Sequence, residues 1–167
     1  MSDVSPLPYL DTKPVGAADF FTAINATFRF IERKLGRVGL LRYWQELGEK
    51  YYAPVAQRWA AGGLPAVAAH WRAAFAAEPG ADVTVEETAD QVLVRVQTCP
   101  AIAHLRTQQR EITPSFCQQC YFVNEAIAAP AGLTVRITGG NGSCQQCFLP
   151  RAAAPQPQNL EDIAPAS

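Results

Sequence analysis

The five cysteines are the residues of this sequence best suited to chemistry. Four of them stand in two copies of one tetrapeptide, Cys-Gln-Gln-Cys, which places Cys117 with Cys120 and Cys144 with Cys147. Cysteine pairs at this spacing are typical zinc ligands, and the same thiolates can hold iron or an iron-sulfur cluster. Twenty-three residues separate the two copies, a gap that a helix returning to a hairpin can bridge. The spacing predicts one zinc ion bound by all four cysteines, with iron or an iron-sulfur cluster as the alternative cofactor.

Two other interpretations of the paired cysteines stay open, namely dithiol redox chemistry and burial as small apolar side chains. A spacing of three puts Cys117 and Cys120 on neighbouring positions of a helix. In a plain strand, by contrast, Cys144 and Cys147 would point to opposite faces. The four-cysteine site therefore requires the chain to turn between Asn141 and Cys147.

Cys99 stands apart from the two pairs. It lies between a predicted strand and a helix whose first residue is Pro100, so it occupies the N-cap position, where converging backbone amides favour a thiolate. This position makes Cys99 the candidate catalytic nucleophile. The preferred interpretation is structural, with a small side chain filling the junction between strand and helix.

The elements that position these cysteines follow from the periodicity of the apolar residues. Apolar side chains three or four residues apart predict helices over 17–36, from 38 onward and over 64–78, and again over 99–109 and 113–131. In the last of these we expect Thr113 as the N-cap and Pro114 at the first helical position. Alternating residues predict a hairpin over 81–98 and a second one around the Gly-Gly-Asn-Gly run at 139–142. We therefore expect an α+β fold, in which N-terminal helices precede a β-β-α-α-β-β unit with an antiparallel sheet of about four strands.

Length and composition restrict the organisation and the partners of the chain. Its 167 residues are 49% hydrophobic and 17% charged, with a net charge of -1, which is typical of one globular domain. We expect a flexible N-terminal arm over 1–16, a single domain over 17–150 and a disordered tail over 151–167. The balanced charge argues against a nucleic-acid or membrane partner. The N-terminus has no signal-peptide pattern, which favours the cytoplasm.

Residues 82–149 carry a resemblance to a known family. The Thr-Cys-Pro step that contains Cys99, a cysteine-bearing helix, and the run from Gly132 to Phe148 resemble the L-2-amino-thiazoline-4-carboxylic acid hydrolase-like family and, more distantly, vinyl-reductase-type ligand-binding domains. The resemblance implies a hydrolase or a ligand-binding domain. The doubling of the second and third cysteines departs from the family pattern and favours metal binding.

The sequence thus predicts a small cytoplasmic zinc-binding domain that acts as an accessory or ligand-binding module, with a larger protein or a small apolar ligand as its partner. The first alternative is a hydrolase of a small C–N bonded substrate that uses Cys99 or the metal. The second alternative is an iron or iron-sulfur redox protein.

Overall fold

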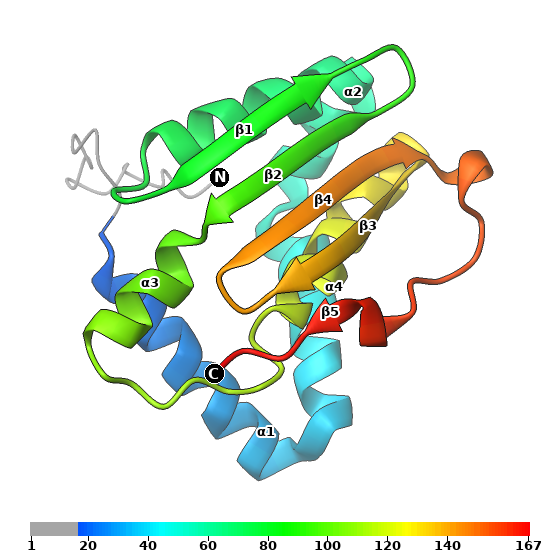
Figure 1. Ribbon diagram of the computed structural model, residues 1–167. Coiled ribbons are helices and arrows are strands. Elements are labelled where there is room, and N and C mark those ends of the chain that lie inside the picture. Colours follow the sequence, from blue (N-terminus) through cyan, green and yellow to red (C-terminus); the bar gives the residue numbers. More distant parts are fainter. Residues whose placement is uncertain (1–16) are drawn as a thin grey trace, which may run out of the picture.

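Long helices followed by strands make up the structure, a computed structural model that describes residues 17–167 (Figure 1). The predicted arm over 1–16 lies outside the described residues. The helices are α1 (Asp19–Glu46), α2 (Ala53–Ala76), α3 (Pro100–Thr107) and α4 (Gln118–Ala128), with single helical turns at Leu47–Tyr51, Ala129–Ala131, Arg151–Ala153 and Leu160–Asp162. The strands are β1 (Asp82–Glu87), β2 (Val92–Thr98), β3 (Leu133–Gly140), β4 (Ser143–Pro150) and β5 (Ile163–Ala164).

Glycine breaks each of the two long helices. Gly36 in α1 has φ 68° and Gly63 in α2 has φ 60°, a left-handed conformation that glycine adopts at little cost. The chain resumes its helix two residues beyond Gly63, at Pro65. The break at Gly36 is where the periodicity predicts the end of the first helix.

The sheet confirms the predicted α+β class and adds a strand to it. The order of the strands is β1-β2-β4-β3-β5, in which the first four are antiparallel neighbours and β5 runs parallel to β3. The turn between β3 and β4 consists of Asn141 and Gly142, which both have positive φ, as a tight hairpin requires. The short β5 was not expected from the sequence.

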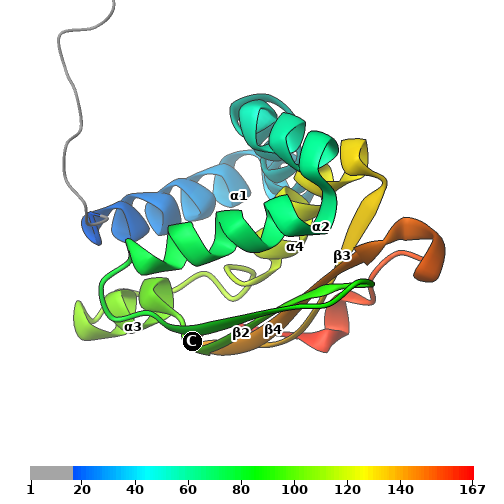
Figure 2. The same ribbon diagram turned by 90° about the horizontal axis from the view of Figure 1, so that it is seen from above.

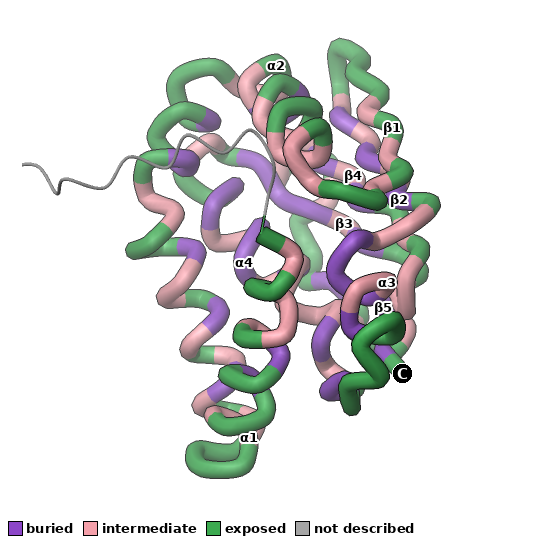
Figure 3. Tube along the Cα trace, turned by 90° about the vertical axis from the view of Figure 1, so that its left-hand side faces the viewer, coloured by how far each residue is buried: buried purple, intermediate pink, exposed green. Residues whose placement is uncertain are grey.

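The helices cover one face of the sheet (Figure 2). Side chains on the inner face of the strands are buried against α2 and α4, whereas α1 packs on α4. Figure 3 shows the buried positions gathering where helices and strands meet. Trp44, Trp59, Phe28 and Phe148 are the largest of the fully buried side chains. The core is therefore a single layer between helices and sheet, and within residues 17–167 none of the four α-helices covers the other face of the sheet.

The start of α4 differs from the sequence prediction. Thr113 was expected to cap a helix beginning at Pro114, but α4 begins at Gln118. The backbone N–H of Thr113 donates to Asn25 Oδ1 at 3.1 Å, and its hydroxyl donates to Glu32 Oε2 at 3.2 Å. Thr113 is thus bound to α1 through both its amide and its hydroxyl, and α4 starts one turn later than expected.

The C-terminal segment also differs from the expectation of a disordered tail over 151–167. Ile163 is buried within β5, and the amide of Gln158 bridges the backbone of Ile137 in both directions, at 2.8 and 3.0 Å. One buried isoleucine and one buried amide leave no periodic pattern in a sequence, which is why the composition alone suggested a loose tail.

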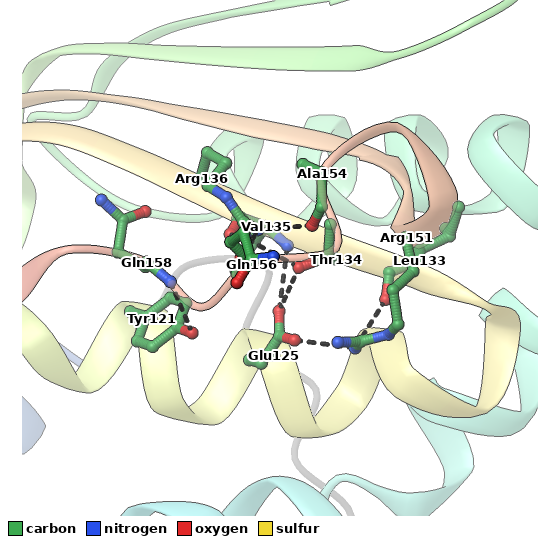
Figure 4. A network of polar contacts seen from close by, with 10 residues as sticks. All are labelled: Tyr121, Glu125, Leu133, Thr134, Val135, Arg136, Arg151, Ala154, Gln156 and Gln158. Carbon is green, nitrogen blue, oxygen red and sulfur yellow. Dashed lines mark hydrogen bonds and ion pairs between the residues drawn. The ribbon is translucent and has the colours of Figure 1, made fainter.

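Charged side chains tie the same segment to α4 and β3, as Figure 4 shows. Arg136 of β3 donates to the carbonyls of Ala154, at 2.6 Å, and Gln156. Glu125 of α4 accepts from Thr134 at 2.8 Å and pairs with Arg151 at 2.7 Å. The chain beyond β4 is therefore held along the edge of the sheet. Within residues 17–167, no helix is long and apolar enough to cross a membrane.

Candidate functional site

A cavity of about 390 Å³ lies between the helices and the inner face of the sheet. Its walls come from the second half of α2, the first turn of α3, the length of α4, and β2, β3 and β4, with Phe21 of α1 and Leu47 beside them. A space of this size is at the lower end of the range for small-molecule sites, which are concave and mainly apolar with a few polar groups. The cavity has an end rich in thiols and an end rich in aromatic side chains.

Four cysteines line the thiol end, namely Cys99, Cys117, Cys120 and Cys144. The turn between β3 and β4 lies against the residues that carry two of them. The backbone N–H of Cys99 donates to the carbonyl of Gly142 at 2.9 Å, and the backbone N–H of Asn141 donates to the sulfur of Cys117 at 3.3 Å. Cys144 follows this turn directly on β4. Cys99 and three of the paired cysteines thus border the same cavity, but they do not form a cluster.

Cys147, the fourth predicted metal ligand, lies on the other face of the sheet. It follows Cys144 by three positions within β4, and side chains alternate along a strand. Its thiol donates to Gln91 Oε1 at 3.2 Å, outside the cavity. The chain turns at Asn141 and Gly142, but both Cys144 and Cys147 then lie in the plain strand β4, so the turn does not bring them to one face.

The predicted ligand set therefore does not fit a single ion in this arrangement, because a sheet stands between Cys147 and the other three thiols. Among residues 17–167, no three side chains of metal-binding type lie close enough together to hold an ion. Zinc, like iron or an iron-sulfur cluster, stays a prediction from the sequence.

Burial governs the protonation of the cavity thiols. It raises the pKa of Cys144 to about 12 and the pKa of Cys120 well above the ordinary thiol value, in the latter case with help from the charge of Cys144. Burial also raises the pKa of Cys99, although the amides of Ile102 and Ala101 act in the opposite direction. At neutral pH these thiols are protonated and form a soft, weakly polar wall.

Cys99 lies at the N-cap of α3, as the sequence predicts. It lines the cavity and is half-buried. The amide groups that could favour a thiolate are present, but desolvation outweighs them in its pKa. The position fits either a nucleophile facing a bound molecule or a side chain that fills the junction.

The aromatic end of the cavity is made by one face of α2. Trp71 stacks on Phe75 with ring centroids 5.4 Å apart and an interplanar angle of 26°, and His70 lies 5.2 Å from the Trp71 ring. Burial lowers the pKa of His70, with a smaller effect of the charge on Arg58, so this ring is neutral near pH 7. Glu78 completes this end just beyond the helix.

Sequence reasoning gave His70 no role beyond that of a core or surface histidine, aligned Trp71 with Phe75 on the predicted helix over 64–78, and did not single out Glu78. Their spacing carried a usable signal, since Trp71, Phe75 and Glu78 stand four and three residues apart and would share one face of the predicted helix over 64–78. A carboxylate in line with two aromatic rings is unusual for a core face.

Two buried amide side chains of the cavity lining pair with each other, since Asn124 donates to Gln146 at 3.1 Å.

Comparison of the chain with protein-family models, with curated proteins and with solved structures finds no match. The case for a function therefore rests on the geometry of the cavity.

Proposed function

We propose that this protein is a small-molecule-binding module, and that its ligand is a mainly apolar molecule held in the cavity between α2, α4 and the sheet. The observation that carries the proposal is the cavity itself, about 390 Å³ of space enclosed by aromatic, aliphatic and thiol side chains. Burial of apolar surface on both partners supplies the free energy of binding.

Binding is preferred to catalysis because of the state of the thiols. A cysteine nucleophile acts as the thiolate, whereas desolvation raises the pKa of Cys99. His104, the histidine of the same helix, has its Nε2 3.5 Å from the hydroxyl of Thr22 on α1, and it is not part of the cavity lining. A hydrolase that uses Cys99 stays the second candidate, supported by the position of this residue at a helix N-terminus facing the cavity.

A matched pair of alanines on α2 tests the binding function. Ala74 lines the cavity, while its neighbour Ala73 is exposed and is not part of the lining. A tryptophan at position 74 should fill the space, so Ala74→Trp should bind an apolar ligand at least about tenfold more weakly, which corresponds to roughly 1.4 kcal/mol. Ala73→Trp should bind as the unmodified protein does.

The neutral fluorescent probe N-phenyl-1-naphthylamine reports this binding through its gain in emission. We expect a saturable increase with the unmodified protein and with Ala73→Trp, and a much smaller one with Ala74→Trp. Equal binding by the two tryptophan variants, or the failure of apolar probes of several sizes to bind at all, would refute the proposed function.

The zinc prediction has its own test, which is elemental analysis of protein prepared under reducing conditions. If the protein holds one metal ion per chain and both Cys144→Ser and Cys147→Ser lose it, the four-cysteine site is favoured. Such a site would require β4 to rearrange. A metal-free protein that binds the probe would leave the ligand-binding function standing without a metal.

A further inference from the structure

Two polar atoms at the aromatic end of the cavity lack a hydrogen-bond partner within residues 17–167. They are the indole Nε1 of Trp71 and Oε2 of Glu78, and both are shielded from solvent. Both residues belong to the cavity lining. Buried polar groups are nearly always paired in native proteins, and an unpaired one is costly. A ligand in the cavity is the natural source of the missing partners.

The chemistry of the two atoms restricts that ligand. An indole N–H can only donate a hydrogen bond, and an ionised carboxylate can only accept one. The ligand must therefore accept from Trp71 and donate to Glu78. An ammonium group only donates, and a carboxylate only accepts and would be repelled by Glu78. A neutral hydroxyl or carboxamide meets both demands.

The surroundings of the two atoms favour a neutral ligand with a ring-sized body. The described lining residues include no lysine or arginine that could pair with an anion. Trp71, Phe75 and His70 present ring surfaces at this end, and planar apolar bodies pack well against such surfaces. The lining residues from α3, α4 and β4 include thiols, which are soft and weakly polar.

We propose that the ligand is a ring-sized apolar molecule with one neutral hydroxyl or carboxamide group, which Trp71 and Glu78 hold by hydrogen bonds. This inference rests on the proposed binding function and specifies the chemistry of its ligand. Trp71 and Glu78 thereby determine which apolar molecules the cavity prefers.

Four probes of nearly equal size test the preference, namely toluene, benzyl alcohol, benzylamine and benzoate, each measured by isothermal titration calorimetry. We expect benzyl alcohol to bind about fivefold more tightly than toluene, as one net neutral hydrogen bond allows, and more tightly than the two charged probes. Equal binding of toluene and benzyl alcohol would overturn this inference and leave the binding function intact. Tightest binding of benzylamine would also overturn it, in favour of a cation site at Glu78. Binding of none of the four would count against both proposals.

The two neighbouring tryptophans of α2 provide a matched control. Trp59 and Trp71 both have a buried indole N–H without a partner in the described part of the chain, but Trp59 is not part of the cavity lining. Trp71→Phe should remove most of the preference for benzyl alcohol over toluene, whereas Trp59→Phe should keep it. Taking the ratio of the two affinities cancels changes in cavity shape.

Glu78→Leu provides an independent variant, since it removes the acceptor and leaves both tryptophans in place. We expect the same loss of preference for benzyl alcohol in this variant. Retention of the preference in both Trp71→Phe and Glu78→Leu would show that these residues do not recognise the polar group, and would refute the inference.

Discussion

Two cysteines of one tetrapeptide have different environments in this molecule. Cys144 faces the cavity and Cys147 faces the opposite side of β4. Burial raises the pKa of Cys144 to about 12, whereas for Cys147 burial produces a smaller rise in pKa. We predict that iodoacetamide at pH 8 modifies Cys147 well before Cys144, because the reactive species is the thiolate and it must be accessible. Peptide mapping by tandem mass spectrometry over time measures both rates in one sample.

Unfolded protein in urea serves as the control for this measurement, since the two thiols should then react at similar rates. Faster modification of Cys144 in the folded protein would contradict the assignment of the two cysteines to opposite faces of the sheet. Similar folded rates for both would also count against it.

The raised pKa of Cys144 also predicts how stability depends on pH. An unfolded thiol titrates near about 8.5, while in the folded chain the pKa of Cys144 is about 12. The thiol's contribution to the free energy of unfolding is fully present below the pKa of the unfolded chain. It is lost as the pH rises through the pKa of the folded chain. The free energy of unfolding should therefore fall between these limits, by about 1.4 kcal/mol per pH unit for each such thiol.

In Cys144→Ser, the free energy of unfolding should fall less steeply with pH, because this thiol no longer titrates. Urea unfolding at pH 8 and at pH 10 measures it, with Cys147→Ser as the comparison, whose slope should stay closer to that of the unmodified protein. An unchanged slope in Cys144→Ser would mean that its thiol is not desolvated as the structure indicates.

At the scale of elements, the C-terminal segment is the part that completes the sheet. Ile163 of β5 is almost fully buried beside Gly139 of β3, while Leu160, in the preceding turn, is only partly covered. We predict that Ile163→Ala lowers the free energy of unfolding by about 2–4 kcal/mol, as is usual for a buried isoleucine. Leu160→Ala should cost clearly less. Chemical denaturation of the two variants tests this, and an effect of Ile163→Ala below that of Leu160→Ala would contradict it.

The elements themselves were largely predictable from the sequence, because each depends on local periodicity. The alternation of Val92, Val94 and Val96 is enough to define the inner face of β2. The start of α4 was not predictable, since Thr113 is engaged by Asn25 and Glu32 from a distant helix. Contacts between segments about eighty residues apart leave no trace in a local pattern.

The candidate site was predictable in part, for a similar reason. Sequence reasoning placed Cys99 at a helix N-terminus and anticipated that a plain strand would separate Cys144 from Cys147. The turn at 139–142, however, packs against the start of α3 and against the residue before α4. Cys99, Cys117 and Cys144 line the same cavity because of this packing, which their spacing in the sequence does not reveal.

At the scale of the whole molecule, the cavity lies between two layers that are joined by packing. The central strands β2 and β4 are each paired on both sides, so they form the stable part of the sheet, whereas α2 and α4 rest on it through side chains alone. Helices held in this way can adjust to a ligand at lower cost than paired strands can. We therefore expect a bound ligand to change the stability of α2 and α4 more than that of the strands.

Hydrogen exchange measured by mass spectrometry should reveal this difference. A saturating apolar ligand that binds only the folded protein stabilises it by mass action, by about 2.7 kcal/mol at one hundred times its dissociation constant. We predict that such a ligand slows exchange most in residues 66–76 of α2 and 118–128 of α4. The exposed turn at 88–91, far along the β1–β2 hairpin from the cavity lining, should exchange at the same rate with and without ligand.

The Ala74→Trp variant provides the control. It should lose the protection of both helices, because the space that the ligand needs is filled. Protection of the turn as strong as that of the helices would place the ligand elsewhere on the molecule.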